Sequence, residues 1–155
     1  MTPDRRSDLA LFALRLAGFG LIFAHGIGKL TGLLGGSDRF VQGVAKLGFP
    51  APLGFAWAAA LVETLGGLLI VLGLATRVAA LLGAVVMAVA AFLRHQAVGQ
   101  LAVHAGLAAT PPAVVESWGS PEKALIYLLV FVALALLGPG RWSLDHLLAR
   151  RRGRR

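Results

Sequence analysis

Four apolar stretches, each about twenty residues long, constrain the fold of this chain more than any other feature. They cover about residues 9–30, 52–74, 77–97 and 122–138, and glycine, proline or charged residues separate them. A bilayer core about 30 Å thick requires about 20 mainly apolar residues per helix, so each stretch can cross a membrane once. The connection between the second and third stretches is so short that these two helices must be antiparallel neighbours. The sequence therefore predicts an all-α fold, a four-helix transmembrane bundle.

Composition supports a membrane protein and excludes several other classes. The residues AVILMFWYC make up 57% of the chain and charged residues 14%, with a mean hydropathy of +0.78, whereas soluble domains contain about 25% charged residues. The formal net charge is +8, but no basic stripe interleaved with aromatic residues is present, so we expect no nucleic-acid partner. The chain has no cysteine, which excludes disulfides and thiolate chemistry contributed by the chain itself.

The placement of arginine predicts the orientation of the bundle. Nine arginines fall on one side of the predicted membrane, namely Arg5, Arg6, Arg77, Arg141, Arg150, Arg151, Arg152, Arg154 and Arg155. Because positive residues favour the cytoplasmic side, we expect both termini in the cytoplasm. We also expect residues 1–149 to form one membrane domain, and residues 150–155 to form a polybasic tail that contacts anionic lipids of the bilayer.

The first outer loop, between the first and second spans, carries an amphipathic pattern. Phe40, Val44 and Leu47 follow Asp38 at the spacing i, i+4 and i+7. This spacing is typical of one face of a helix. We therefore predict a short interfacial helix in this loop.

Ionisable side chains inside the spans are the candidate catalytic residues. Such a group costs about 2.5–3.5 kcal/mol at the centre of a membrane helix on insertion scales, and it usually faces the bundle interior. Glu63 lies near the middle of the second span, about 16 Å along a helix that starts at Pro52. His25, His95 and Glu122 fall in the outer halves of the other three spans. We therefore expect His25, Glu63, His95 and Glu122 to line one cavity.

An overlapping set of residues is the candidate ligand-binding site. His25 and Lys29 are spaced i, i+4 and share a helix face. Glu63 lies on the next span, and Tyr127 lies just over one turn into the fourth. An apolar pocket with few polar groups suits a quinone, whose carbonyls need hydrogen-bond donors and whose reduction needs proton carriers. We expect Glu63 to carry protons, His25 to donate to a carbonyl, and the remaining catalytic candidates to reach the outer aqueous phase.

Other interpretations of these residues stay open. Glu63 can instead be a structural carboxylate paired with Arg15, Lys29 or a histidine, and a solvated position at the interface explains His95 equally well. The histidines could in principle ligate haem, or bind a metal together with Glu63. No histidine pair has metal-ligand spacing on one helix face, however, so the sequence predicts no metal site.

Charged residues near the predicted cytoplasmic ends of the spans form a separate group. Arg77, Arg141 and Asp145 lie near the ends of the second, third and fourth spans, and Arg15 lies about 9 Å inside the first. We expect Arg15, Arg77, Arg141 and Asp145 to form structural salt bridges at the interface.

A series of short motifs covers nearly the whole chain. They are Leu14-Arg15-Leu16 before His25-Gly26 and Lys29, Phe49-Pro50, Glu63 with Gly66-Gly67, Gly73-Leu74 with Thr76-Arg77, Met87 and Ala90 before His95, Glu122-Lys123-Ala124-Leu125 with Tyr127, and Gly138-Pro139-Gly140-Arg141 with Ser143-Leu144-Asp145. In order and spacing the series resembles the DoxX family of small four-helix membrane proteins. The long Ala- and Pro-rich stretch before Glu122 departs from that pattern.

The resemblance implies a multi-pass protein of the bacterial cytoplasmic membrane. Members of the family include the membrane subunit of thiosulfate:quinone oxidoreductases and proteins linked to thiol and oxidative-stress handling with soluble partners. We therefore expect a quinone-linked oxidoreductase, or the membrane subunit of a redox complex, with a soluble redox partner. A homo-oligomer stays open. The alternative is a non-catalytic scaffold or small-molecule transport protein whose polar residues only hold helices together.

Overall fold

The computed structural model describes residues 3–152, with side chains from residue 5 onward, and within this range it contains helices and no strand. In chain order they are α1 (Pro3–Arg15), α2 (Ala17–Leu21), η1 (Ile22–Gly26), α3 (Ile27–Leu34), α4 (Arg39–Lys46), α5 (Pro52–Leu61), η2 (Val62–Gly66), α6 (Gly67–Leu72), α7 (Thr76–Ala88), η3 (Val89–Arg94), α8 (Ala97–His104), α9 (Pro112–Trp118), α10 (Glu122–Leu137) and α11 (Leu144–Arg152). The label η marks a π-helical segment. The all-α fold predicted from the sequence is confirmed.

Four helical segments of the described chain are long and apolar enough to cross a membrane. They are Arg5–Leu34, Pro52–Leu72, Thr76–Arg94 and Pro112–Leu137. The second segment ends two residues earlier than the sequence suggested, because Gly73 adopts φ +70°, a left-handed conformation that terminates helices. The fourth contains a turn at Gly119, so α10 is its continuous part. The protein is thus a multi-pass membrane protein with four candidate spans.

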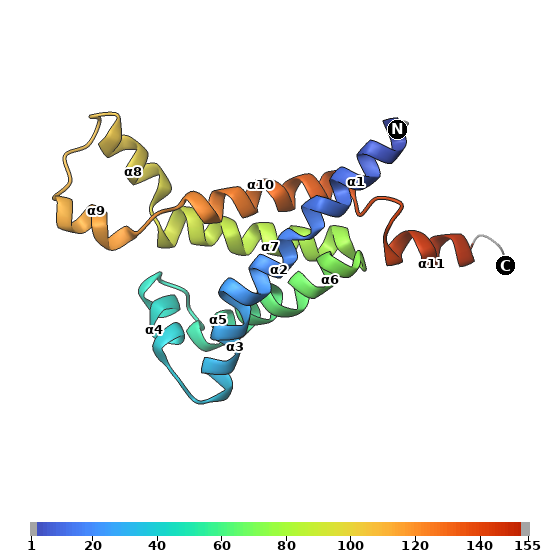
Figure 1. Cartoon of the computed structure of the whole chain (residues 1–155). Coiled ribbons are helices and arrows are strands. Elements are labelled where there is room, and N and C mark those ends of the chain that lie inside the picture. Colours follow the sequence, from blue (N-terminus) through green and yellow to red (C-terminus); the bar gives the residue numbers. More distant parts are fainter. Residues whose placement is uncertain (1–2, 153–155) are drawn as a thin grey trace.

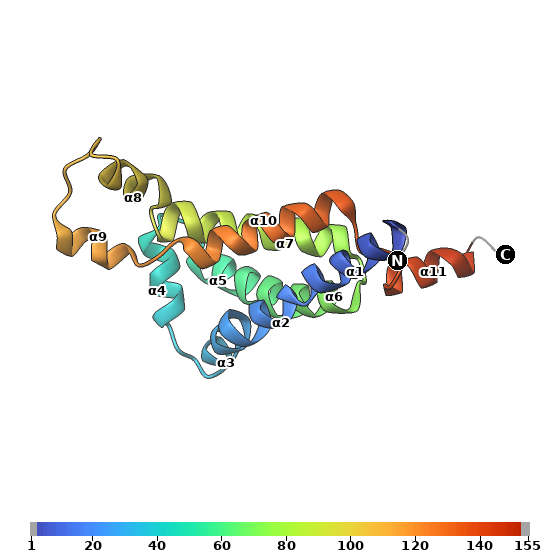
Figure 2. The same ribbon diagram turned by 45° about the horizontal axis from the view of Figure 1, so that its top comes forward.

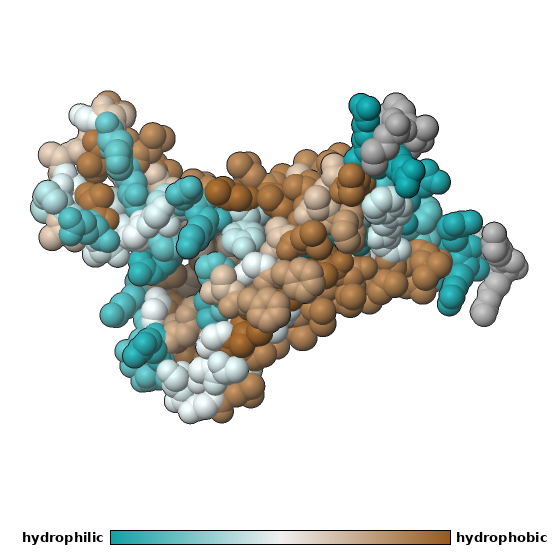
Figure 3. All heavy atoms as spheres, viewed as in Figure 1, coloured by the Kyte–Doolittle hydropathy of each residue, from teal (hydrophilic) through white to brown (hydrophobic). Residues whose placement is uncertain are grey.

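The spans run side by side, and both ends of the described chain lie at the same end of the bundle (Figures 1 and 2). We call this the terminal end, and it carries the start of α1 and the whole of α11. The opposite, distal end carries α4 on one side and the pair α8 and α9 on the other. The short helix expected after the first span is present as α4. Figure 3 shows a brown apolar band between teal polar surfaces at the two ends, as a bilayer requires.

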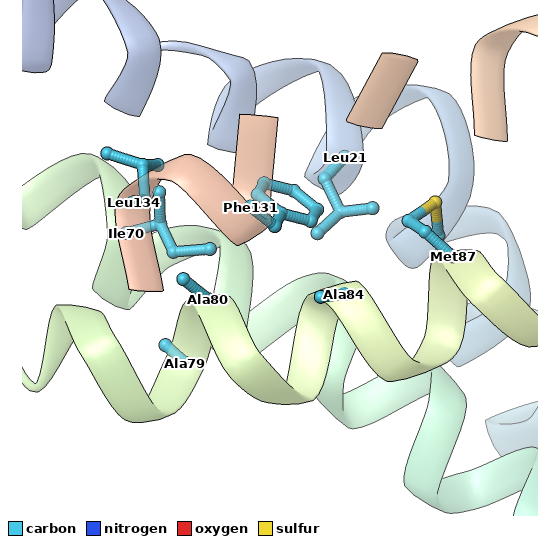
Figure 4. Close-up of a cluster of buried hydrophobic side chains, with 8 residues drawn as sticks. All are labelled: Leu21, Ile70, Ala79, Ala80, Ala84, Met87, Phe131 and Leu134. Atoms are coloured by element: carbon cyan, nitrogen blue, oxygen red, sulfur yellow. The ribbon is translucent and has the colours of Figure 1, made fainter. Parts of the chain in front are cut away.

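Small residues of α7 allow α10 to pack closely against it. Ala80 and Ala84 of α7 face Phe131 of α10, which is fully buried (Figure 4). A Cβ atom placed on Gly83 would lie 2.9 Å from the Phe131 ring, so a larger residue would force the two helices apart. Outward-facing side chains such as Leu136 of α10 are instead exposed, as expected of a surface in contact with lipid.

Candidate functional site

Two of the predicted site residues lie in π-helical segments. His25 belongs to η1 and Glu63 to η2, and η3 ends at Arg94, next to His95. In a π-helix each backbone N–H donates to the carbonyl five residues earlier, and the N–H of His95 donates to the Ala90 carbonyl in this way at 2.9 Å. Such segments are rare in helices and occur frequently at functional sites. Hydropathy patterns carry no signal for them, so sequence reasoning missed this feature.

Glu63 and Lys29 form an ion pair between the first and second spans. Lys29 Nζ donates to Glu63 Oε1 at 2.5 Å, and the carboxylate side chain is 1% exposed while the lysine side chain is 28% exposed. The lysine ammonium also lies 4.7 Å from the centre of the Phe40 ring, in a cation–π contact. Glu63 Oε2 is buried and has no hydrogen-bond partner among the described residues. One oxygen of this carboxylate is therefore satisfied and the other is not.

A glycine brings the two π-helical segments into backbone contact. A Cβ atom placed on Gly26 would lie 2.6 Å from Thr64 Oγ1 and 2.9 Å from the backbone nitrogen of Thr64. Only glycine allows η1 and η2 to approach this closely. The buried Thr64 hydroxyl also has no hydrogen-bond partner among the described residues. Sequence reasoning did not select Gly26 or Thr64, since neither carries a charge.

His25 of the first span and Tyr127 of the fourth form a ring contact. Their ring centroids are 6.1 Å apart in an edge-to-face arrangement. The Tyr127 hydroxyl lies against the backbone of Gly20, where any Cβ atom would collide with it. His25 is also within electrostatic range of Glu63 and Lys29. The four residues predicted to bind a ligand thus form two contacts, Lys29 with Glu63 and His25 with Tyr127.

His95 and Glu122 occupy the distal end, outside this group. His95 Nδ1 donates to the carbonyl oxygen of Trp118 at 2.7 Å, so its ring holds the end of α9 against the third span. Glu122 is exposed at the start of α10, where the Ser120 hydroxyl accepts its backbone N–H. No hydrogen bond or ion pair between described residues joins either side chain to Glu63. His95 is, however, within electrostatic range of His25.

A pocket of about 410 Å³ adjoins the ion pair at the distal end. It lies between α3 and α4, and Lys29, Arg39 and Phe40 contribute to its walls. Its volume falls in the usual range of small-molecule sites, about 300–1,000 Å³. Lys29 therefore contacts both the buried carboxylate and this pocket. Among the described residues, no three His, Asp or Glu side chains gather as a metal would require.

Among the described residues, the predicted salt-bridge residues at the terminal end form no ion pair with one another, although Arg15 is within electrostatic range of Asp145. Arg141 Nε lies 3.9 Å from Asp8 Oδ2, and Asp8 Oδ1 also accepts the Arg141 backbone N–H at 2.8 Å. Asp145 accepts the backbone N–H groups of Ala75 and Thr76, at 2.8 and 3.0 Å, and so caps the start of α7. Asp8, which the sequence reasoning did not select, is the acidic partner of Arg141.

The other two residues of that group contact the segment after α10. Arg15 is fully buried and its guanidinium donates to the carbonyl oxygen of Trp142. The guanidinium also lies 5.4 Å from the centre of the Phe12 ring. Arg77 lies beside Gly138, at the end of α10. These contacts attach the segment that leads to α11 to the first and third spans.

This geometry defines a class: a small four-span membrane bundle with a polar group buried at helix crossings in its distal half. The chain belongs to the DoxX family, whose family model matches residues 10–96, more than half of its 155 residues. The matched range contains Arg15, His25, Lys29, Glu63 and His95, and it ends before α8. Searches of curated proteins and of solved structures found no match to the chain.

Proposed function

We propose that this membrane protein is a quinone-linked oxidoreductase, or the membrane subunit of one. The observation that carries the proposal is Glu63, a carboxylate 1% exposed inside a span, bound to Lys29 through one oxygen and unpartnered at the other. An ionisable group at such a position is expensive in lipid and usually has a function. A carboxylate beside an ammonium group suits a proton carrier.

The neighbouring side chains suit the two carbonyl oxygens of a quinone. The side chains of Lys29, His25 and Tyr127 can donate hydrogen bonds from two spans, and the three residues are half-buried. Reduction of a quinone to a quinol takes two electrons and two protons. On this proposal a soluble redox partner supplies the electrons and Glu63 delivers protons. His95 and Glu122, at the distal end, return protons to Glu63 from the aqueous phase.

The orientation belongs to the same proposal. Arginines of the described chain gather at the terminal end, including Arg77 and Arg141, and the positive-inside rule then places both termini in the cytoplasm of a bacterial cell. The basic tail of residues 150–155 contacts anionic lipids there, although residues 153–155 lie outside the described range. The distal end, with its pocket, faces outward.

Two substitutions test the function. Glu63→Gln keeps the size of the side chain, so the purified variant should retain decylubiquinone binding. In membranes supplied with soluble extract of the same cells, the variant should abolish the decylubiquinone reduction that depends on this protein. His25→Ala should instead weaken decylubiquinone binding. Glu116→Gln, an exposed carboxylate of α9, is the matched control and should behave like the parent chain. Unchanged turnover in Glu63→Gln rejects the proton-carrier role. A parent chain that binds no quinone favours the scaffold or transport alternative.

A further inference from the structure

The pocket between α3 and α4 has a cationic wall. Lys29 of α3 and Arg39 of α4 line it, together with Ser37 and Phe40, and no acidic side chain does. Leu33 and the glycines at positions 28, 32 and 43 complete the wall around a space of about 410 Å³. This charge pattern favours an anion over a neutral ligand.

Several N–H donors of Lys29 and Arg39 form no hydrogen bond with other described residues. An ammonium group has three N–H donors, and Glu63 accepts one from Lys29. The Arg39 guanidinium has neither a hydrogen bond nor an ion pair with any described residue, although Asp38 is its neighbour in sequence. The Asp38 carboxylate instead accepts from Gln42 at 2.5 Å. A guanidinium group is the side chain best suited to bind a phosphate through two parallel hydrogen bonds.

The pocket lies at the depth expected for the headgroup region of a bilayer. Lys29 lies 24 residues after Arg5, at the start of the first candidate span, or about 36 Å along a helix that rises 1.5 Å per residue. The hydrocarbon core is about 30 Å thick. Lys29, and with it Arg39 of the same pocket, therefore lies near the level of lipid headgroups. Phe23 and Ile27, which precede Lys29 in the first span, are 69% and 38% exposed and offer an apolar surface to acyl chains.

We propose that this pocket binds a phosphate group, held by Arg39 and by the free N–H donors of Lys29, with Ser37 as a further donor. The phosphate comes from a phospholipid headgroup, whose acyl chains follow the outer surface of the first span, or from phosphate in solution. This site shares Lys29 with the quinone proposal but does not depend on it, because phosphate binding requires no electron transfer and leaves the bond between Lys29 and Glu63 in place.

Two variants remove the site in different ways. Arg39→Gln removes the guanidinium charge, and Lys46→Gln, on the same helix but outside the pocket wall, is its control. Gly43→Leu keeps both cations but fills the pocket. A Cβ atom on Gly43 meets nothing within 4 Å, so the substituted side chain can leave the backbone without a clash. Gly54→Leu, in α5, introduces the same side chain at an equally open position away from the pocket and is its control.

The measurement is the rise in thermal unfolding temperature of detergent-solubilised protein on titration with dioleoylphosphatidylglycerol or with inorganic phosphate. We expect the parent chain and both controls to respond to one of these probes. Arg39→Gln and Gly43→Leu should need at least about tenfold more of it, the effect of losing about 1.4 kcal/mol. A response to the lipid alone identifies a headgroup as the source, and a response to phosphate alone identifies a soluble anion. The proposal is overturned if neither probe stabilises the parent chain, or if both pocket variants respond as their controls do.

Discussion

At the scale of single residues, the ion pair between Lys29 and Glu63 decides how the buried carboxylate is tolerated. Removing one member of a fully buried pair costs about 3–5 kcal/mol, because the other charge loses its partner. Here the lysine side chain is 28% exposed, so water screens part of that effect. We predict that Lys29→Met lowers the unfolding free energy by about 1–3 kcal/mol. Denaturant titration in mixed micelles measures this change.

A double-mutant cycle separates the interaction energy of the Lys29–Glu63 pair from the effect of removing each side chain. Glu63→Gln should destabilise the bundle less than Lys29→Met, because the amide keeps its size and leaves no buried charge. In the Glu63→Gln background, Lys29→Met should then have a smaller effect than in the parent chain. Lys46→Met is the control for loss of an exposed lysine. Equal effects of Lys29→Met in both backgrounds would contradict a coupled pair.

The spacing of charged and polar residues along the chain predicted part of the arrangement of this site. His25 and Lys29 lie i, i+4, and the structure places both near Glu63, which hydropathy alone singles out as a charge within a span. The bond from Arg15 to the Trp142 carbonyl could not be predicted, because it depends on how a distant turn folds back. The function of the site residues remains a prediction.

At the scale of helices, the contact between η1 and η2 sets the distance between the first two spans. Gly26 lies against the backbone of Thr64. We predict that Gly26→Ala destabilises the protein by about 1–3 kcal/mol, because the added methyl group overpacks a contact that backbone atoms cannot relieve. Denaturant unfolding of the purified variant measures the loss, and turnover should fall with it if the crossing positions Glu63.

The neighbouring glycine provides the control for that experiment. A Cβ atom on Gly28 meets nothing within 4 Å. Gly28→Ala should therefore leave stability unchanged or raise it by up to about 1 kcal/mol, because alanine favours a helix more than glycine does. If both alanine variants are equally stable, the close approach of η1 and η2 does not constrain the bundle.

The sequence predicted those helices that have a regular pattern of apolar residues. The i, i+4, i+7 pattern predicted a helix that the structure has as α4. The π-helical segments did not follow, because one extra residue per turn changes hydrogen bonding without changing composition. Nor did α8 and α9, which are short and lie in a stretch rich in alanine and proline. The contact of His95 with the Trp118 carbonyl, which joins the end of α9 to the third span, also has no sequence signal.

At the scale of the whole molecule, the two ends of the bundle differ in charge and in how they are closed. The terminal end is fastened by Asp8, Arg15 and Asp145, which bind backbone groups of distant segments. The distal end spreads into α4 on one side and α8 with α9 on the other (Figure 1). A closed basic end and an open end with a pocket fit a protein that receives a ligand from the distal side.

This asymmetry leads to a prediction about orientation. Because arginine concentrates at the terminal end, a cysteine placed at Ala149 in α11 should be cytoplasmic, and one placed at Ala108, between α8 and α9, should face outward. Both positions are exposed, and the chain has no cysteine of its own to give background. An impermeant maleimide applied to intact spheroplasts should label Ala108→Cys at once, and Ala149→Cys only after the membrane is permeabilised. The reverse pattern would place the pocket and the Glu63 site nearer the cytoplasm, and protons would then have to reach Glu63 from that side.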